Sequence, residues 1–485
     1  MVQPFAVLNL LSVVTLLFAL SMAVPLGVSY ATGDGALAAF EQGMAITALA
    51  GLLARAATKG RRRELQVRDG FLLVALGWTL MPALATLPLL LYLPELSFTD
   101  AYFECASGLT TTGATVLVGL DTLPPSINFW RCQLQWLGGM GIIVLAVAIL
   151  PLLGVGGSQM FRAETPGPMK DTKLTPRITE TAKGLWAVYT LITVFCVLGL
   201  KWAGMDWLDA VMHAFGTMAL GGLSSHDASY AFWNSPWIEA VTIFFMLLAG
   251  MNFGSHFLAM RKLSLAVYPR DPEILPYLGV LVVSVLGVAL FLWLKGVYAE
   301  PLTALRYSAF NVVSIATTTG FASTDFGRWP VFAPVWMLFL CCFATCSGST
   351  GGGIKLVRAL IMAKQAVREM QRIIHPRAYF SIKFGGQPVE NNVVFAVLAF
   401  MLVYGGSIVA MTMLLAASGL DIVTAFTAVI ACINNTGPGL GEVGPAGNFA
   451  VLTDLQTWVC SFAMLLGRLE LFTLLVVLTP AFWRK

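Results

Sequence analysis

The amino-acid sequence predicts an all-α membrane protein, in which two N-terminal transmembrane helices precede four repeated helical units. Three observations support this fold class: an apolar composition, an alternation of basic and acidic connections, and a fourfold internal repeat. Of the 485 residues, 58% are hydrophobic and only 11% are charged, whereas soluble domains usually carry about 25% charged residues. So large a deficit of charge over a long chain indicates that most helices face lipid or one another.

Six apolar runs approach the roughly 20 residues that an α-helix needs to cross a bilayer. They are residues 4–28, 70–93, 185–203, 278–294, 393–417 and 457–482. The first run is long enough to span, and no Lys or Arg precedes Arg55, so we expect a retained helix rather than a signal peptide. A second helix is expected over about 36–57.

Basic residues cluster in alternate connections of the chain, and this pattern predicts the topology. Five segments hold 23 of the 29 Lys and Arg residues: 55–68, 162–183, 261–270, 355–383 and 484–485. The acid-rich segments between them contain only Arg306 and Arg328. By the positive-inside rule the basic segments are cytoplasmic, which predicts ten crossings with both termini inside.

The acid-rich segments contain four copies of one motif. Aligned without gaps, Gly113, Gly222, Gly320 and Gly437 fall in one column; the four stretches are LSFTDAYFECASGLTTTGAT (96–115), MDWLDAVMHAFGTMALGGLS (205–224), TALRYSAFNVVSIATTTGFA (303–322) and GLDIVTAFTAVIACINNTGPGL (419–440). Each copy begins at a polar or acidic turn, runs through about fourteen mostly apolar residues and ends in Thr, Gly or Asn. A helix of about fourteen residues rises about 21 Å, which is too short for a hydrocarbon core of about 30 Å.

Each copy must therefore enter the membrane from outside and leave on the same side. Re-entrant backbone at membrane depth is tolerated only where it is buried in protein or lines a watery cavity. We expect four pseudo-symmetric helix–pore-loop–helix repeats around a central pore, with the N-terminal extension at 1–65 and the repeats at 66–160, 161–265, 266–385 and 386–485. The alternative is four amphipathic helices on the membrane surface, which fits less well because these helices are apolar on most faces.

The residues before each aligned glycine suit a dehydrated monovalent cation. Backbone carbonyls supply oxygen ligands without a charged trap, and glycine permits the positive φ that turns consecutive carbonyls toward an axis. Leu220 has no side-chain oxygen, so the backbone rather than side chains must coordinate the ion in all four copies. We call Gly113, Gly222, Gly320 and Gly437 the filter glycines; the predicted ion-binding carbonyls are those of Thr111, Thr112, Leu220, Gly221, Thr318, Thr319, Asn435 and Thr436.

The segments TTTGAT, MALGGLS, ATTTGFAS and NNTGPG resemble the four filter segments of the Trk/Ktr/HKT superfamily of potassium transporters. The two extra N-terminal helices are similar to those of the bacterial Trk-type membrane subunits, the TrkH family. In that superfamily, glycine at all four positions accompanies potassium over sodium, and serine at the first accompanies sodium transport.

The resemblance implies a gated potassium channel, expected to pass rubidium as well, in the bacterial inner (plasma) membrane. It also implies a homodimer and a ring of cytoplasmic, nucleotide-binding TrkA-type subunits. The basic segment 355–383 is either a solvated cytoplasmic face or the place where such a regulator docks. Membrane lipid and the potassium ion are the other partners implied.

A glycine-rich run interrupts the crossing expected over about 331–371, and it predicts a gate. The run reads Cys-Ser-Gly-Ser-Thr-Gly-Gly-Gly over 346–353, and an interior glycine costs a helix about 1 kcal/mol relative to alanine. Close packing through small residues is the alternative. We call residues 346–353 the gate loop; the predicted gate residues within it are Gly348, Thr350, Gly351, Gly352 and Gly353.

Arg468 is expected to be the only Lys or Arg well inside an otherwise apolar crossing. A charge at that depth costs at least about 2.5–3.5 kcal/mol and should face the interior with partners. We therefore expect Arg468 to form the closed constriction together with the gate loop. The alternative is an ion pair with Glu470, although residues two apart on a helix do not face each other.

Two other functions stay open at this point. A secondary transporter that couples potassium to H⁺ or Na⁺ usually shows inverted repeats and buried acids, whereas these repeats share one orientation and Glu104 is the one acid deep in a pore helix. A membrane enzyme needs a His, Asp or Ser cluster, and the sequence shows none. Gly439–Gly444 matches GxGxxG without a preceding strand, and the eight cysteines show no CxxC spacing. We therefore expect no enzyme activity, no cofactor and no nucleic-acid partner.

Overall fold

The computed structural model describes residues 4–59, 67–144 and 178–484. Helices form nearly all the regular structure of these residues, and the exception is one short hairpin, β1 (Lys383–Phe384) and β2 (Gln387–Pro388). The all-α fold class is confirmed. Most of the predicted basic loop 162–183, part of the loop 55–68, and the expected repeat boundaries at 65/66 and 160/161 lie outside the described residues.

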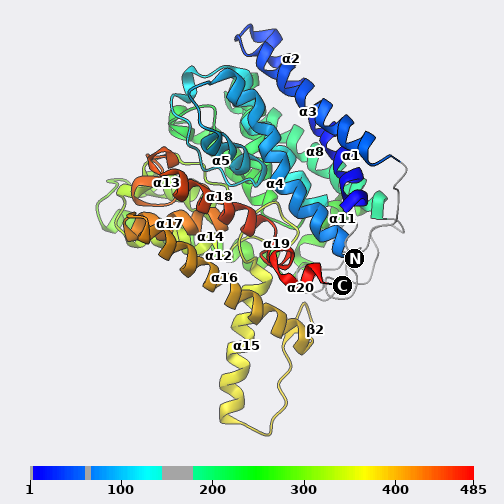
Figure 1. The fold of residues 1–485 in the computed structure, drawn as a ribbon. Helices are drawn as coiled ribbons and strands as arrows, with labels where there is room; N and C mark the ends of the chain where they lie inside the picture. Colours follow the sequence, from blue (N-terminus) through cyan, green and yellow to red (C-terminus); the bar gives the residue numbers. More distant parts are fainter. Residues whose placement is uncertain (1–3, 60–66, 145–177, 485) are drawn as a thin grey trace.

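The N-terminal extension consists of two spans that run side by side. α1 (Pro4–Ser21) and α2 (Ala23–Thr32) together make one apolar span, and α3 (Leu37–Ala57) returns beside α1 (Figure 1). Close approach depends on a glycine, because a Cβ on Gly51 would lie 2.9 Å from Leu16 Cγ. The two predicted N-terminal helices are confirmed.

Each repeat consists of an outer helix, a short pore helix and an inner helix. The outer helices are α4 (Val67–Tyr92), α8 (Ile178–Ala203), α12 (Ile274–Leu294) and α16 (Asn391–Ala417). The pore helices are α5 (Phe98–Leu109), α9 (Trp207–Ala219), α13 (Pro301–Ala316) and α17 (Ile422–Ile433). The inner helices are α6 (Pro125–Val144), α10 and α11 (Pro236–Ala249, Phe253–Lys262), α14 and α15 (Phe332–Cys341, Leu356–Ile374), and α18 and α19 (Asp454–Arg468, Phe472–Leu478).

The connections carry short 3₁₀ turns, and the chain closes with one more helical turn. These are η1 (Leu120–Thr122), η3 (Ser229–Phe232), η4 (Leu265–Arg270), η5 (Phe326–Arg328), η6 (Gly441–Val443), η7 (Phe449–Val451) and α20 (Pro480–Trp483).

The pore helices start where the sequence places polar turns. Side-chain oxygens of Ser97, Asp206 and Asp421 accept backbone N–H groups of the first turns of α5, α9 and α17, which satisfies donors that a helix start leaves unpaired. The pore helix α13 instead begins with Pro301, whose fixed φ suits the first helical position. The four pore helices have 12, 13, 16 and 12 residues, too few to cross a bilayer.

Three inner helices are broken, and only one of these breaks was predicted. The axes of α10 and α11 differ by 94°, those of α18 and α19 by 116°, and a non-helical stretch over 342–355 separates α14 from α15. The expectation of one continuous crossing over 457–482 is wrong. Glu470 and Leu471 both have positive φ, 52° and 51°, which ends α18 because right-handed helix requires negative φ.

Six described helical spans are long and apolar enough to cross a membrane, and the two bent pairs raise the number to eight. The other two predicted crossings correspond to α6, which carries Arg131, and to α14, which has 10 residues. The chain is therefore a multi-pass membrane protein, and ten crossings with both termini inside stay a prediction.

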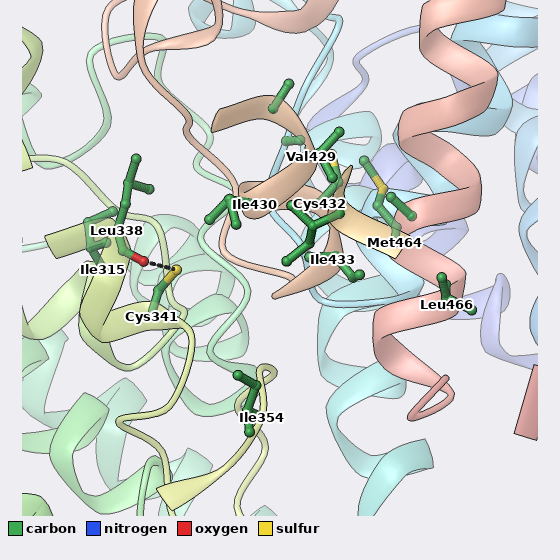
Figure 2. Close-up of a cluster of buried hydrophobic side chains, with 14 of the residues drawn as sticks. Ile315, Leu338, Cys341, Ile354, Val429, Ile430, Cys432, Ile433, Met464 and Leu466 are labelled. Carbon is green, nitrogen blue, oxygen red and sulfur yellow. Dashed lines mark hydrogen bonds between the residues drawn. The ribbon is translucent and has the colours of Figure 1, made fainter. Parts of the chain in front are cut away.

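The pore helix α17 shows how the core positions the repeats. Figure 2 shows Ile430 and Ile433 of α17 beside Met464 of α18, with Leu338 and Cys341 of α14 nearby. Burial between helices in lipid gains van der Waals packing rather than removal of apolar surface from water, so close packing of this kind both drives the association of the helices and fixes their positions. Seven of the eight cysteines are buried.

Candidate ion-conducting pore

The four filter glycines lie on one closed ring. A Cβ built on Gly113 would overlap Gly221 O, one on Gly222 would overlap Thr319 O, and one on Gly320 would overlap Thr436 O. The ring closes because a Cβ on Gly437 would lie 2.9 Å from Thr112 O. Each glycine therefore touches a predicted ion-binding carbonyl of the next unit, in the order one, two, three, four and back to one.

The backbone before each filter glycine adopts the same unusual conformation in all four units. The residue two positions earlier is left-handed in every case: Thr111, Leu220, Thr318 and Asn435 have φ of 54°, 53°, 62° and 54°. The filter glycines themselves have φ of 83°, 72°, 89° and 97°. Positive φ is rare outside glycine and is an outlier for a β-branched threonine. The strained backbone therefore recurs in all four units, although units two and four differ from the Thr-Thr-Thr-Gly of units one and three.

Side chains behind the ring hold these strained segments in place. Thr110 Oγ1 and Thr112 Oγ1 are 2.8 Å apart, and the same pair of positions in unit three, Thr317 and Thr319, repeats this distance. Asn435 Nδ2 donates to Thr112 Oγ1 at 2.9 Å, which joins units four and one. Gln135 on α6 of unit one supports unit two, because its Nε2 donates to Gly221 O and its Oε1 accepts Leu223 N–H.

A cavity of about 100 Å³ opens beside the ring, large enough for several water molecules. All four filter glycines line it, and its polar lining includes Arg131, Ser224, His226 and Asp227. The eight residues predicted to offer carbonyls are buried or nearly so, which suits a narrow passage rather than an open mouth.

The gate loop contacts three of the four units directly behind their filter segments. Thr350 Oγ1 donates to Met218 O at 2.9 Å, and Gly352 N–H donates to Thr318 Oγ1 at 2.9 Å. A Cβ on Gly352 would overlap Asn434 O, and one on Gly351 would lie 3.1 Å from Thr317 O. Glycine is needed at these positions because the loop packs directly against the backbone of the neighbouring units. The alternative explanation of the glycine-rich run, close packing through small residues, predicts such contacts as well.

The other two predicted gate residues bend the loop. Gly348 and Gly353 have φ of 74° and 78°, and a Cβ on Gly348 would lie 2.7 Å from Asn252 Oδ1. Gly348 O accepts Phe253 N–H at 3.0 Å, and Cys346 N–H donates to Gly250 O at 3.1 Å. The loop therefore docks into the elbow between α10 and α11.

The side chain of Arg468 contacts the gate loop, as predicted. Its hydrogen-bond partners are backbone carbonyl groups rather than a carboxylate. Its side chain is 2% exposed; Nη1 donates to Thr350 O at 2.9 Å and Nη2 to Gly138 O at 3.1 Å. The alternative ion pair with Glu470 is wrong, because Glu470 pairs with Arg358 at 3.0 Å. Among the residues described, Arg468 has no ion pair with an acid.

Arg468 is not the only buried basic residue, although the sequence pattern singled out Arg468 alone. Arg131, Lys355 and Arg358 are buried too. Lys355 was assigned to the cytoplasmic basic segment, yet its Nζ donates to Gly351 O of the gate loop. The available signal was its position in the sequence, because Lys355 stands two residues after Gly353, the last glycine of the gate loop.

Comparison with known proteins decides the family. A family model described as "TrkH: Cation transport protein" matches residues 36–485. The chain belongs to the TrkH family. Relatives in this family include the Trk system potassium uptake proteins TrkH of Salmonella typhimurium and of Escherichia coli K12, each 46% identical over 481 residues that cover 99% of both chains.

A solved TrkH structure has the same fold. The crystal structure of the potassium transporter TrkH from Vibrio parahaemolyticus is similar with a TM-score of 0.92 and 42% sequence identity, over 99% of this chain and 100% of that one. These findings confirm the resemblance inferred from the four filter segments. They also confirm that the chain is not an enzyme, because TrkH-family proteins are cation transport proteins.

In this TrkH-family chain a titratable cluster joins units one and two beside the ring. His226 Nδ1 is 2.5 Å from Asp121 Oδ1, and Nε2 is 3.1 Å from Asp209 Oδ2. The imidazole also stacks on Phe232, with ring centroids 3.7 Å apart. Burial alone would lower the pKa of His226, but the hydrogen bonds to Asp209 and Asp121 outweigh it and raise that pKa above 6.5.

This cluster predicts a pH dependence of stability. The imidazolium donates to both carboxylates, whereas the neutral ring has one N–H and donates to only one. Because the folded pKa is raised, the stabilisation is complete below the unfolded pKa of about 6.5 and is lost as pH rises through the folded value. We expect less than about 1 kcal/mol, since the pair is partly exposed.

The measurement is the thermal unfolding midpoint of the detergent-solubilised protein between pH 6 and pH 9. The wild type should lose stability over this range more steeply than His226→Gln, which keeps a polar side chain but does not titrate. Equal slopes for the two proteins would contradict the expectation.

Proposed function

We propose that this chain is the pore-forming subunit of a potassium uptake system and passes potassium, and rubidium, along the axis of the filter ring. The observation that carries the proposal is the closed ring of filter glycines, each against the predicted ion-binding carbonyls of the next unit. The relatives named above are potassium uptake proteins, and glycine occupies all four positions. Eight carbonyls, those predicted from the sequence, then replace the water shell of the ion.

The pore helices supply the electrostatic part of this proposal. α5, α9, α13 and α17 end three to four residues before their filter glycines, so their C-terminal ends lie next to the ring. Each end carries roughly half a negative charge, and four of them stabilise a monovalent cation. No carboxylate is needed at the ring, which leaves the ion free to move on.

A channel is favoured over a symporter because the one carboxylate deep in a pore helix is already neutralised. Glu104 and Arg131 form an ion pair of 2.7 Å, and both side chains are 1% exposed. A coupling carboxylate has to exchange protons or bind sodium during transport, whereas the Glu104 carboxylate is already bonded to Arg131, Thr115 and Val116.

We propose that the gate loop and Arg468 close the pore below the ring. Arg468 and Lys355 each donate to a carbonyl of the loop. Two positively charged side chains therefore lie where a permeating potassium ion would have to pass. Displacing the loop requires breaking these bonds and those to Met218 and Thr318.

The cytoplasmic regulator is proposed to dock on α15. This amphipathic helix and the hairpin after it project from the helical bundle (Figure 1). Its exposed apolar residues are Val367, Met370, Ile373 and Ile374, and a groove of about 520 Å³ runs between α15 and residues 379–383, which lead into the hairpin. We further propose a homodimer in the bacterial inner membrane with both termini inside.

The test is rubidium uptake into proteoliposomes that contain the purified protein. Tracer rubidium should accumulate along its own electrochemical gradient, with and without a protonophore and in sodium-free buffer, and potassium should compete at lower concentrations than sodium. Uptake that collapses with the proton gradient or without sodium would favour the symporter. Equal competition by sodium would overturn the proposed selectivity.

A further inference from the structure

The structure shows a polar side chain at the same place in three of the four pore helices. Glu104, His213 and Asn311 each stand nine residues before the filter glycine of their unit, and Ala428 holds the fourth position. The three polar side chains are buried, with exposures of 1%, 0% and 0%. Buried polar groups cost free energy unless they are hydrogen-bonded, so each must have a partner.

The partner is in every case the backbone or hydroxyl just after the filter glycine. We call the first three residues after each filter glycine the outgoing arm. Glu104 accepts Thr115 Oγ1–H at 2.9 Å and Val116 N–H at 3.0 Å. His213 Nε2 lies 2.9 Å from Ser224 Oγ.

Units three and four make the same connection with other groups. Asn311 donates to Ser323 Oγ at 3.0 Å and accepts Ser323 N–H at 3.2 Å. In unit four Thr427, one residue before Ala428, accepts Leu440 N–H at 2.9 Å. A carboxylate, an imidazole, an amide and a hydroxyl therefore all join the pore helix to the outgoing arm.

The carboxylate in unit one needs a counter-charge, and that counter-charge extends the connection to unit two. Arg131 Nε donates to Glu104 at 2.7 Å, while Nη1 donates to Ser224 O at 3.0 Å. Ser224 is also the partner of His213. Arg131 thus joins the outgoing arms of two neighbouring units.

From this pattern we infer that Glu104, His213, Asn311 and Thr427 are positioning residues that set the cation selectivity of the ring. The inference rests on the proposed function. The filter segments hold strained φ angles that persist only if the surroundings fix them, and each segment is held at one end by its pore helix. The bond to the outgoing arm fixes the other end, and so fixes the spacing of the carbonyls. None of these side chains touches the ion.

Because four different groups make this connection, the requirement is a hydrogen bond rather than a particular residue. The test therefore compares a substitution that keeps the hydrogen bond with one that removes it. His213→Asn should keep the wild-type preference for potassium over sodium within about twofold, because Asn serves in unit three. His213→Leu should reduce that preference by up to about tenfold, which corresponds to about 1.4 kcal/mol and to the upper end of what one hydrogen bond contributes.

The readout is competition of potassium and sodium against tracer rubidium in proteoliposomes, alongside the total uptake rate and the thermal unfolding midpoint. Ser224→Ala removes the same bond from the other side without changing a pore helix, so it should shift the preference in the same direction. Leu89→Met, a conservative change at a fully buried residue of α4 that packs in an apolar cluster with α1 and α3, is the control and should leave the preference unchanged.

Unit one offers an independent check, because there the connection between pore helix and outgoing arm includes the ion pair of Glu104 and Arg131. Arg131→Met alone leaves Glu104 buried without its counter-charge and should lose more selectivity than Glu104→Gln combined with Arg131→Met. If folded His213→Leu and Ser224→Ala proteins both keep the wild-type preference, the inference is overturned. If the wild-type protein itself shows no preference for potassium, the proposed function fails instead, and the two failures are thus distinguishable.

Discussion

Alanine at Gly113, Gly222 or Gly320 should abolish potassium-selective uptake, whereas alanine at Gly437 should retain a measurable part of it. The first three glycines face a carbonyl of the next unit so closely that an added Cβ would overlap it, while at Gly437 the nearest carbonyl oxygen would be 2.9 Å away. Backbone atoms cannot move aside for an added Cβ as the end of a flexible side chain can. The ring must therefore widen at three positions and shift only slightly at the fourth.

All four substitutions also pay a conformational cost, because every filter glycine has positive φ and an alanine there costs of order 1 kcal/mol. Tracer rubidium uptake with sodium and potassium competitors measures the outcome, and thermal unfolding reports whether the protein still folds. The matched control is Gly77→Ala in α4, where an added Cβ meets no atom within 4 Å. Wild-type selectivity in Gly222→Ala would refute the ring as the selective element.

The filter segments could be predicted because their signal is local and repeated. Glycine in one column, a run too short to span and a polar turn at the start are all visible in 20 residues. The left-handed residues two positions earlier could not be predicted, since Thr111, Leu220 and Asn435 share no side-chain property that favours positive φ. Only the requirement to close a ring imposes that conformation.

The breaks in the inner helices also divide into those with a local signal in the sequence and those without one. The gate loop was visible because three consecutive glycines cannot continue a helix cheaply. The break after Arg468 carries no such signal, because Leu469, Glu470 and Leu471 are all compatible with helix. It forms where Gly467 packs on Ile433 O and Glu470 turns away to meet Arg358, and both contacts depend on distant segments.

Buried charges were the hardest part of the site to predict. Lys355 and Arg358 stand at the edge of a basic loop and were counted with it, and Arg131 lies in a helix whose flanks are polar. Their partners, Gly351 O, Glu470 and Glu104, are brought to them by tertiary structure. A count of charges along the chain gives topology, but it does not show which charges turn inward.

Arg468→Ala should raise the rubidium flux of the closed protein by at least about tenfold. The substitution removes a buried positive charge from the proposed pathway; two unit charges 4 Å apart repel by about 4 kcal/mol at an effective dielectric constant of 20. It also removes the two hydrogen bonds through which Arg468 ties Thr350 of the gate loop to Gly138 of α6. Both effects favour an open pathway, so they add.

A lysine separates these two contributions, because it keeps the charge but lacks the planar fork that reaches two carbonyls at once. Arg468→Lys should therefore give a flux between the wild type and Arg468→Ala. Lys295→Ala, at an exposed residue that follows the C-terminal end of α12, should leave flux unchanged. The measurement is uptake without any added regulator, at matched protein incorporation. An Arg468→Ala protein that folds and conducts no faster than wild type would show that the constriction lies elsewhere, since a charge removed from a narrow cation pathway cannot leave its barrier untouched.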